Sequence, residues 1–213
     1  MVNQVLVQQK VNHGYSIAAS KLGKTFVQYR PQTGGPVFVN TNIVQELDLM
    51  FDQDYHFSVL KPQQYNDNNY FALMDLTYVQ VGDYLTDNNG TVFFVAWIEP
   101  LRPAEILLCN RTITLYTPSG SIGNGYGGDT DPVTKLTDWP VSLLPGTKGE
   151  VNESRTPGSV RAPWGVIQMP KPPGDIKVNE YDLVIDDRNY RFIISTSSLA
   201  KEGFYLTIAT ENA

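Results

Sequence analysis

The chain has 213 residues and a formal net charge of −6, and 41% of its residues are hydrophobic and 11% aromatic. This hydrophobic content suffices for a packed core in one large β domain or two small modules, so a disordered chain is not expected. The negative charge excludes tight non-specific binding to nucleic acid, because such binding needs clustered Lys and Arg.

The composition also favours strands over helices. Only 18% of the residues are charged, and exposed helix faces would need more Glu, Lys and Ala. The one cysteine, Cys109, lies in an apolar run and is expected to be a buried small hydrophobe. The first ten residues show no secretory signal, and no run reaches the ~18 apolar residues of a membrane span. We therefore expect a soluble protein without a membrane partner.

The first predicted element is a helix that ends at Gly23, which is expected in a left-handed conformation at the C′ position. Apolar residues at spacings of four, four, three and four mark one face of this helix: Val7, Val11, Tyr15, Ala18 and Leu22. The stripe is narrow, so the helix must pack on another element. That element is either its own β module or a neighbouring subunit. Residues 1–36 are assigned to this helix and an arm.

Residues 37–118 are expected to form a first β module. Asn89-Gly90 is the dipeptide best suited to the two positive φ angles of a type I′ hairpin turn. The strand that follows, residues 91–98, is apolar on both faces, which predicts a central strand that is covered on both sides.

Residues 119–165 are dense in Gly, Pro, Ser and Thr, and this composition predicts a long extended loop. Two apolar islands interrupt it, at residues 138–145 (DWPVSLLP) and 162–165 (APWG). The tryptophans in these islands either anchor the loop to a partner surface or fold back onto their own module.

Residues 166–213 are expected to form a second β module that is related to the first. Residues 83–96 (DYLTDNNGTVFFVA) align without a gap with residues 182–195 (DLVIDDRNYRFIIS), 99 positions later. Asn189 replaces Gly90 and keeps the turn, because Asn tolerates a left-handed conformation. The predicted fold class is therefore mainly β, with two small related β-barrel or sandwich modules, a short N-terminal helix and a long Gly/Pro-rich loop.

We expect no catalytic, cofactor or metal site and no enzymatic activity. Residues 123–128 satisfy G-x-G-x-x-G, but no strand precedes them and no helical stripe follows. Residues 87–89 are interpreted as a turn, because the terminal Glu of a calcium loop is missing. Glu99 and Glu105 could serve as paired glycosidase carboxylates only if the fold brought them into one cleft.

Several blocks of the chain resemble virion structural proteins of tailed bacteriophages. They are residues 14–23 (GYSIAASKLG), 29–31 (YRP), 81–85 (VGDYL), 93–95 (FFV), 100–103 (PLRP), 109–111 (CNR), 139–146 (WPVSLLPG), 148–150 (KGE), 161–164 (RAPW) and 182–194. The hairpin pattern GD-x-L…D-x-x-G…F-x-V is also similar to the small β-barrels of phage head–tail connector proteins. The second copy departs from it, with Tyr181 for Gly82 and Asn189 for Gly90.

This resemblance implies a virion protein made in the host cytoplasm, namely a head–tail connector subunit of the neck or head-completion type. Such subunits form a homo-oligomeric ring through a heterologous contact. The implied partners are portal, head-completion or tail proteins, with DNA only as passing cargo. Intersubunit contacts are expected at Val7, Val11, Tyr15, Trp139, Leu143, Leu144 and Trp164.

Other functions stay open from the residues alone. A tail or baseplate component is the nearest alternative. Twelve tyrosines and the Asn/Gln-rich residues 63–70 also fit a carbohydrate-binding receptor module, although we favour a protein interface for them. A wall-degrading hydrolase is the third alternative.

Overall fold

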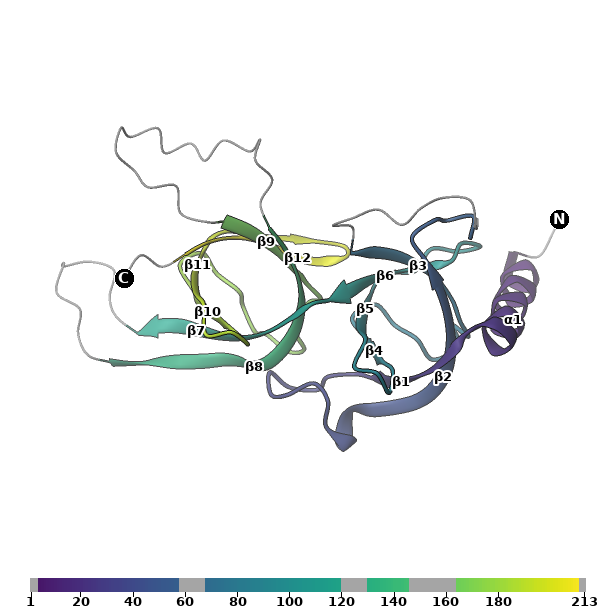
Figure 1. The fold of residues 1–213 in the computed structure, drawn as a ribbon, viewed down its shortest axis with the longest axis horizontal. Helices are drawn as coiled ribbons and strands as arrows, with labels where there is room; N and C mark the ends of the chain where they lie inside the picture. Colours follow the sequence, from purple (N-terminus) through teal and green to yellow (C-terminus); the bar gives the residue numbers. More distant parts are fainter. Residues whose placement is uncertain (1–3, 58–67, 120–129, 146–163, 211–213) are drawn as a thin grey trace.

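The computed structural model describes residues 4–57, 68–119, 130–145 and 164–210. Within these ranges the protein is mainly β, as the composition predicts, with helix α1 (Gln4–Leu22) at one end of the molecule and two closed barrels beside it (Figure 1). Barrel 1 is built from β1 (Lys24–Tyr29), β2 (Ile43–Asp52), β3 (Asn69–Leu73), β4 (Tyr84–Thr86), β5 (Val92–Trp97) and β6 (Ala104–Cys109), with the short 3-10 helix η1 (Asn40–Asn42) before β2. Barrel 2 is built from β7 (Arg111–Ser119), β8 (Thr130–Pro145), β9 (Trp164–Met169), β10 (Leu183–Asp186), β11 (Arg191–Ala200) and β12 (Gly203–Thr210).

The two barrels have the same topology. The strand order is β1-β2-β3-β6-β5-β4 in barrel 1 and β7-β8-β9-β12-β11-β10 in barrel 2, and every pairing is antiparallel. In each barrel the fourth strand lies beside the first, which gives a Greek-key arrangement. The likeness of the two hairpins therefore extends to six strands in each barrel.

The boundary between the barrels lies at Asn110, and it differs from the expected module limits. Strand β1 falls in the segment assigned to the arm (1–36), and β7, assigned to the first module (37–118), belongs to barrel 2. The second barrel therefore begins well before residue 166.

Strand β8 is the largest departure, because it lies within the predicted loop of residues 119–165. Its prolines give the segment the composition of a loop, yet the strand accommodates Pro140 opposite Thr112. The register of β8 against β7 shifts at three places, and Asp138 has a positive φ of 49°. Such bulges allow a proline inside a sheet, since they release backbone groups from regular pairing.

Helix α1 ends where the sequence predicts, but Gly23 serves a different purpose. Gly23 is absent from the residues with positive φ, so the expected left-handed conformation is wrong. A Cβ atom at Gly23 would instead lie 2.5 Å from the carbonyl oxygen of Ala19 and 2.6 Å from that of Leu49. Glycine is required here because the end of the helix and β2 approach each other closely.

The hairpin turns also differ from the type I′ prediction. Only Gly90 has a positive φ (83°), not Asn89, and the N–H of Gly90 donates to the carbonyl of Asp87 (3.2 Å). The N–H of Asp87 donates to the carbonyl of Thr91 (3.1 Å). This is a type I turn followed by a left-handed residue, the usual three-residue hairpin loop. Asn189, with φ 63°, repeats the geometry in barrel 2.

Strand β5 is covered on both faces, as predicted. Phe93 and Val95 belong to the core inside barrel 1. Phe94 and Ala96 belong to a second core that includes the interior of barrel 2. Alternate residues of one strand therefore fill two cores, which is why its sequence is apolar throughout.

Candidate functional site

The predicted contact residues of α1 lie against the protein's own barrel. Val7, Val11 and Tyr15 are half-buried. The Tyr15 hydroxyl donates to the carbonyl of Leu101 (3.3 Å), and the N–H of Leu101 donates to the side-chain oxygen of Gln8 (2.8 Å). Of the two alternatives for the helix, the structure shows the first, in which it packs on its own module. The face turned away carries exposed Leu6 (54%) and Ile17 (42%), and Leu22 of the predicted stripe is 71% exposed.

Trp139 is not an exposed anchor. Its side chain is completely buried and contacts the ring of Tyr84 edge to face, with 6.0 Å between ring centroids. The alternative in which this tryptophan folds back onto its own chain is therefore the observed one. Leu143 and Leu144 are half-buried in β8, and Trp164 begins β9.

Polar bonds join the two barrels around this tryptophan. The Tyr84 hydroxyl donates to the carbonyl of Pro140 (2.9 Å), and burial raises the pKa of this phenol well above its usual value. The Asn68 side chain donates to the hydroxyl of Ser142 (2.8 Å). Between the barrels, the Asn110 side chain both accepts from the N–H of Leu143 (2.8 Å) and donates to its carbonyl (2.9 Å). The barrels are therefore fixed by paired polar groups as well as by apolar contact.

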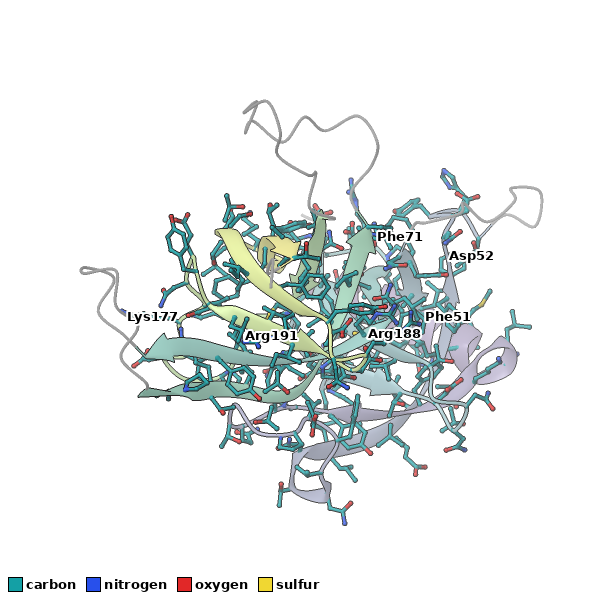
Figure 2. The ribbon with its side chains drawn as sticks, turned by 60° about the vertical axis from the view of Figure 1, so that its left-hand side comes forward. Phe51, Asp52, Phe71, Lys177, Arg188 and Arg191 are labelled. Atoms are coloured by element: carbon teal, nitrogen blue, oxygen red, sulfur yellow. The ribbon has the colours of Figure 1, made fainter. Side chains whose placement is uncertain are left out.

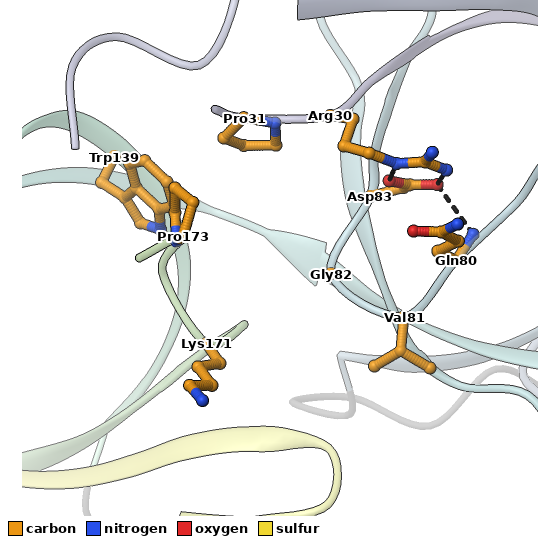
Figure 3. Close-up of a pocket in the computed structure, with 9 residues that line it drawn as sticks. All are labelled: Arg30, Pro31, Gln80, Val81, Gly82, Asp83, Trp139, Lys171 and Pro173. Atoms are coloured by element: carbon orange, nitrogen blue, oxygen red, sulfur yellow. Dashed lines mark hydrogen bonds and ion pairs between the residues drawn. The ribbon is translucent and has the colours of Figure 1, made fainter. Parts of the chain in front are cut away.

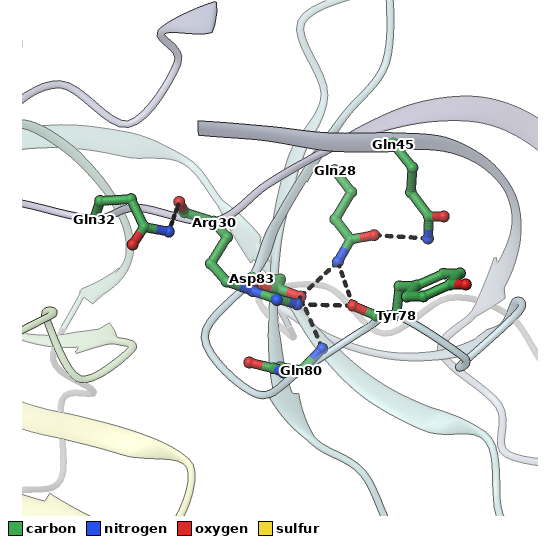
Figure 4. Close-up of polar contacts among 7 residues, drawn as sticks. All are labelled: Gln28, Arg30, Gln32, Gln45, Tyr78, Gln80 and Asp83. Atoms are coloured by element: carbon green, nitrogen blue, oxygen red, sulfur yellow. Dashed lines mark hydrogen bonds and ion pairs between the residues drawn. The ribbon is translucent and has the colours of Figure 1, made fainter. Parts of the chain in front are cut away.

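A buried carboxylate, Asp83, organises the entrance to β4 (Figure 4). Arg30 holds it in a two-pronged ion pair, with both N···O distances 2.7 Å. The side-chain amide of Gln28 (2.6 Å) and the backbone N–H of Gln80 (2.7 Å) also donate to it. Arg30 and Gln28 both donate to the carbonyl of Tyr78 as well. Because Arg30, Gln28 and the backbone N–H of Gln80 all donate to it, this carboxylate holds the loop before β4 in place.

Barrel 2 repeats this arrangement 99 positions later. Asp182 is buried, and it accepts from the N–H of Asn179 (2.8 Å) and from the ammonium group of Lys135 (2.6 Å). The cation comes from a different strand, since Arg30 follows β1 whereas Lys135 lies in β8. In the sequence, both carboxylates align as the first residues of the two hairpins, and their cations were not predicted. Aspartate occupies the same position in both aligned hairpins, at Asp83 and Asp182, and this match is the feature of the sequence that points to a shared role.

A small cavity lies between the barrels (Figure 3). Its volume is about 100 Å³, and its walls are Arg30, Pro31, Gln80, Val81, Gly82, Asp83, Trp139, Lys171 and Pro173. Ligand pockets usually measure roughly 300–1,000 Å³, so this one suits a few waters or a small ion. The indole N–H of Trp139 is buried with no hydrogen-bond acceptor among the described residues.

The carboxylates in the two hairpin turns accept hydrogen bonds from backbone N–H groups. Asp87 accepts from the N–H groups of Asn89 (3.0 Å) and Thr91 (2.8 Å), and Asp186 accepts from those of Arg188 (3.0 Å) and Tyr190 (2.8 Å). Burial alone would raise the pKa of Asp87, but the hydrogen bonds from residues 89 and 91 outweigh it and lower that pKa. These hydrogen bonds confirm the interpretation of residues 87–89 as a turn, and residues 186–190 repeat it in barrel 2.

Glu99 lies close enough to Glu105 for its charge to act on that carboxyl group. Burial raises the pKa of Glu105, and the charges of Glu202 and Glu99 raise it further. Glu99 is also paired with Arg102 at 2.9 Å. Neither glutamate lines the cavity between the barrels, so the condition set for a glycosidase pair, a shared cleft, is not met there.

Cys109 is partly exposed as a residue, yet burial raises the pKa of its thiol, as expected for an unreactive cysteine. Across the described ranges, no group of three or more His, Cys, Asp or Glu residues could hold a metal ion. The predicted glycine loop at residues 123–128 lies outside the described residues. No helix in the part of the chain that the structure describes is both long and apolar enough for a membrane span.

Charge is unequally divided between the barrels. The described residues of barrel 1 (24–57 and 68–109) include three basic and nine acidic ones, whereas those of barrel 2 (111–119, 130–145 and 164–210) include seven basic and eight acidic ones. Figure 2 shows Lys177, Arg188 and Arg191 on barrel 2, and Asp52 on barrel 1. The negative charge of the protein is thus concentrated on barrel 1.

No protein-family model, curated protein or solved structure matches this chain.

Proposed function

We propose that this chain is a structural virion protein of a tailed bacteriophage, and specifically a ring subunit of the head–tail connector that links portal and tail. The observation that carries the proposal is the duplicated small barrel. Its first copy contains the hairpin pattern GD-x-L…D-x-x-G…F-x-V, which resembles connector proteins, in residues 82–95.

Two further features support a role in assembly. The conspicuous carboxylates Asp83, Asp87, Asp182 and Asp186 all accept hydrogen bonds that hold loops in place. Helix α1 also exposes several large apolar side chains at one end of the molecule. Exposed apolar surface of this kind is typical of protein interfaces.

The test is reconstitution with virion particles. Purified protein is mixed at micromolar concentration with portal-bearing heads that lack a neck and, separately, with isolated tails, and both are imaged by negative-stain electron microscopy. We expect a ring at the portal vertex or at the tail end. The double variant Leu6→Glu/Ile17→Glu should bind less well, while Asp175→Ala, an exposed polar position outside this helix, should bind normally. A protein that binds neither particle would refute the proposal.

Exposed tyrosines favour a second candidate, a carbohydrate-binding module. Tyr78, Tyr181 and Tyr190 are each about 60% exposed; Tyr181 lies just before β10 and Tyr190 lies in the turn between β10 and β11. Stacking of sugar rings on such side chains would be abolished by Tyr181→Ala or Tyr190→Ala. Glycan-array binding that these variants remove, without incorporation into virion particles, would favour this candidate over the connector.

A further inference from the structure

Barrel 1 packs on barrel 2 through a row of residues on neighbouring strands. Strand pairing sets Tyr29 opposite Tyr84, Tyr84 opposite Phe94, and Phe94 opposite Leu107. Tyr84, Phe94 and Leu107 belong to the core that includes barrel 2, and Tyr29 packs against it. We call these four residues the outer row of barrel 1.

Barrel 2 carries the same row. Pairing sets Tyr116 opposite Leu183, Leu183 opposite Ile193, and Ile193 opposite Ala209. Leu183 and Ile193 lie 99 positions after Tyr84 and Phe94, so these four residues form the outer row of barrel 2. All four are apolar or aromatic, and all are only half-buried, whereas their counterparts on β4, β5 and β6 are buried.

The other end of the molecule is arranged differently. Barrel 1 contacts barrel 2 largely at β8, whose counterpart in barrel 1 is β2. Strand β2 is covered by α1. The helix therefore packs on the side of barrel 1 that corresponds to the side of barrel 2 on which barrel 1 packs. Each barrel therefore has one covered side and one apolar side without a second barrel on it. At one end of the molecule the uncovered apolar surface is Leu6 and Ile17 of the helix, and at the other end it is the outer row of barrel 2.

The charges around these surfaces are compatible with contact between them. Arg191 lies on the same face of β11 as Ile193, two residues away, and Arg188 and Lys177 also lie on barrel 2 (Figure 2). Strand β2, beneath the helix, carries Glu46, Asp48 and Asp52 within an acidic barrel. Opposite charges at the edges of an interface promote encounter and fix the orientation of the partners.

We propose that the outer row of barrel 2 docks on the α1 end of barrel 1 in a second copy of this chain. The copies then associate head to tail, through a contact that uses different surfaces on each copy. Such a contact closes into a ring or grows into a filament, depending on the rotation between copies. This inference deepens the proposed connector function and rests on it for the choice of a ring.

The first test is self-association of the full-length chain, measured by size-exclusion chromatography with light scattering across a range of concentrations. We expect the wild type to form oligomers. Ile193→Glu should weaken association by about 30-fold or more, because it places a charge in the centre of an apolar interface. Leu199→Glu is the matched control, since Leu199 is an exposed apolar residue of the same strand outside the row. Circular dichroism checks that each variant is folded.

A monomeric wild type at all concentrations, or an unchanged Ile193→Glu oligomer, would overturn the proposal. If Ile193→Glu fails to fold, the milder Ile193→Ser replaces it and the same criterion applies.

The second test is the orientation of the copies. Ile193→Cys protein is mixed with Ile17→Cys protein and oxidised, with wild type as the control for cross-links through the partly exposed Cys109. A mixed cross-linked dimer is expected. Cross-links only between two Ile193→Cys copies would overturn the head-to-tail arrangement.

These results are separable from the connector function. A protein that associates through this row yet binds neither heads nor tails would keep the inference and refute the connector. A protein that binds particles as a monomer would keep the role in the virion and refute the head-to-tail contact between copies.

Discussion

Barrels 1 and 2 share a hydrogen-bonded backbone but differ in the side chains attached to it. The N–H of residue 82 donates to the carbonyl of residue 95 (2.8 Å), and that of residue 181 donates to the carbonyl of residue 194 (2.8 Å). Both β5 and β11 shift register just after these residues. A positive φ recurs at Gly82 (95°) and Tyr181 (69°). The aspartates and the backbone hydrogen bonds therefore define the module, while the glycine before the hairpin and the cation that pairs with the aspartate differ between the copies.

One variation shows how the copies diverged without loss of the module. Gln28 is buried in barrel 1 and donates to Asp83, whereas strand pairing places the apolar Leu115 at its position in barrel 2. The buried side-chain amide of Gln28 needs a hydrogen-bond partner for its oxygen as well, and the side-chain N–H of Gln45 donates to that oxygen at 2.9 Å. Barrel 1 is thus held by a polar network where barrel 2 uses an apolar contact.

The largest expected effect comes from removing either buried carboxylate. Asp83→Ala should lower the free energy of unfolding by about 3–5 kcal/mol, because it removes the acceptor of the Arg30 guanidinium and of the Gln28 side-chain amide. Asp182→Ala should also be strongly destabilising, but less so, since fewer donors are lost. Urea denaturation measures both, with the exposed Asp175→Ala as control. An effect of Asp83→Ala no larger than that of the control would show that the network is dispensable.

A smaller effect is expected at the junction between the barrels. Tyr84→Phe removes the hydroxyl that donates to Pro140 and leaves the ring contact with Trp139 intact. The loss should be about 1 kcal/mol of unfolding free energy, the usual net value of a buried hydrogen bond. Thermal unfolding would detect it. Tyr190→Phe, which removes the hydroxyl of an exposed ring, should show no comparable loss, and equal losses in the two variants would contradict this assignment.

The turns should respond oppositely in the two barrels. Gly90→Ala should cost about 1 kcal/mol through its positive φ alone, since a Cβ there meets nothing within 4 Å. Asn189→Gly should instead be neutral or slightly stabilising, because glycine relieves the strain of φ 63°. Chemical denaturation of both variants tests this pair. A stable Gly90→Ala would mean that the turn can adopt another conformation.

The smallest expected effect is a pH dependence at Glu105. Its folded pKa is raised above the unfolded one, so its unfavourable contribution is absent in acid and grows as pH rises through the folded pKa. Glu105→Gln should therefore stabilise the protein by a few tenths of a kcal/mol at neutral pH and not near pH 4, since partly exposed charges are well screened. Unfolding curves at both pH values provide the measurement. An equal gain at both would exclude a charge effect.

The sequence predicted the features that repeat or alternate. The hairpin likeness and the apolar character of both faces of β5 were visible in the pattern of residues. Features that depend on distant contacts were not. Gly23 is explained by the approach of Leu49, and Trp139 by the ring of Tyr84, neither of which is a local signal.

Strand β8 and the outer rows could not be predicted, because both depend on how strands that are distant in the sequence pair with one another. Prolines usually indicate a loop, and the bulges that accommodate them appear only when β7 lies alongside. The outer row of barrel 2 could be recognised only by superposing the strand pairings of the two barrels, since its four residues come from four separate strands.

The most direct test is hydrogen exchange of the wild-type protein, followed by mass spectrometry at low and at high protein concentration. Peptides covering residues 84–96 should be protected equally at both concentrations, because barrel 2 covers them in every molecule. Peptides covering residues 183–195 should gain protection as concentration rises and a second copy occupies their outer face. Protection of both hairpins that does not change with concentration would contradict the idea of one module used twice with one face kept for a neighbour.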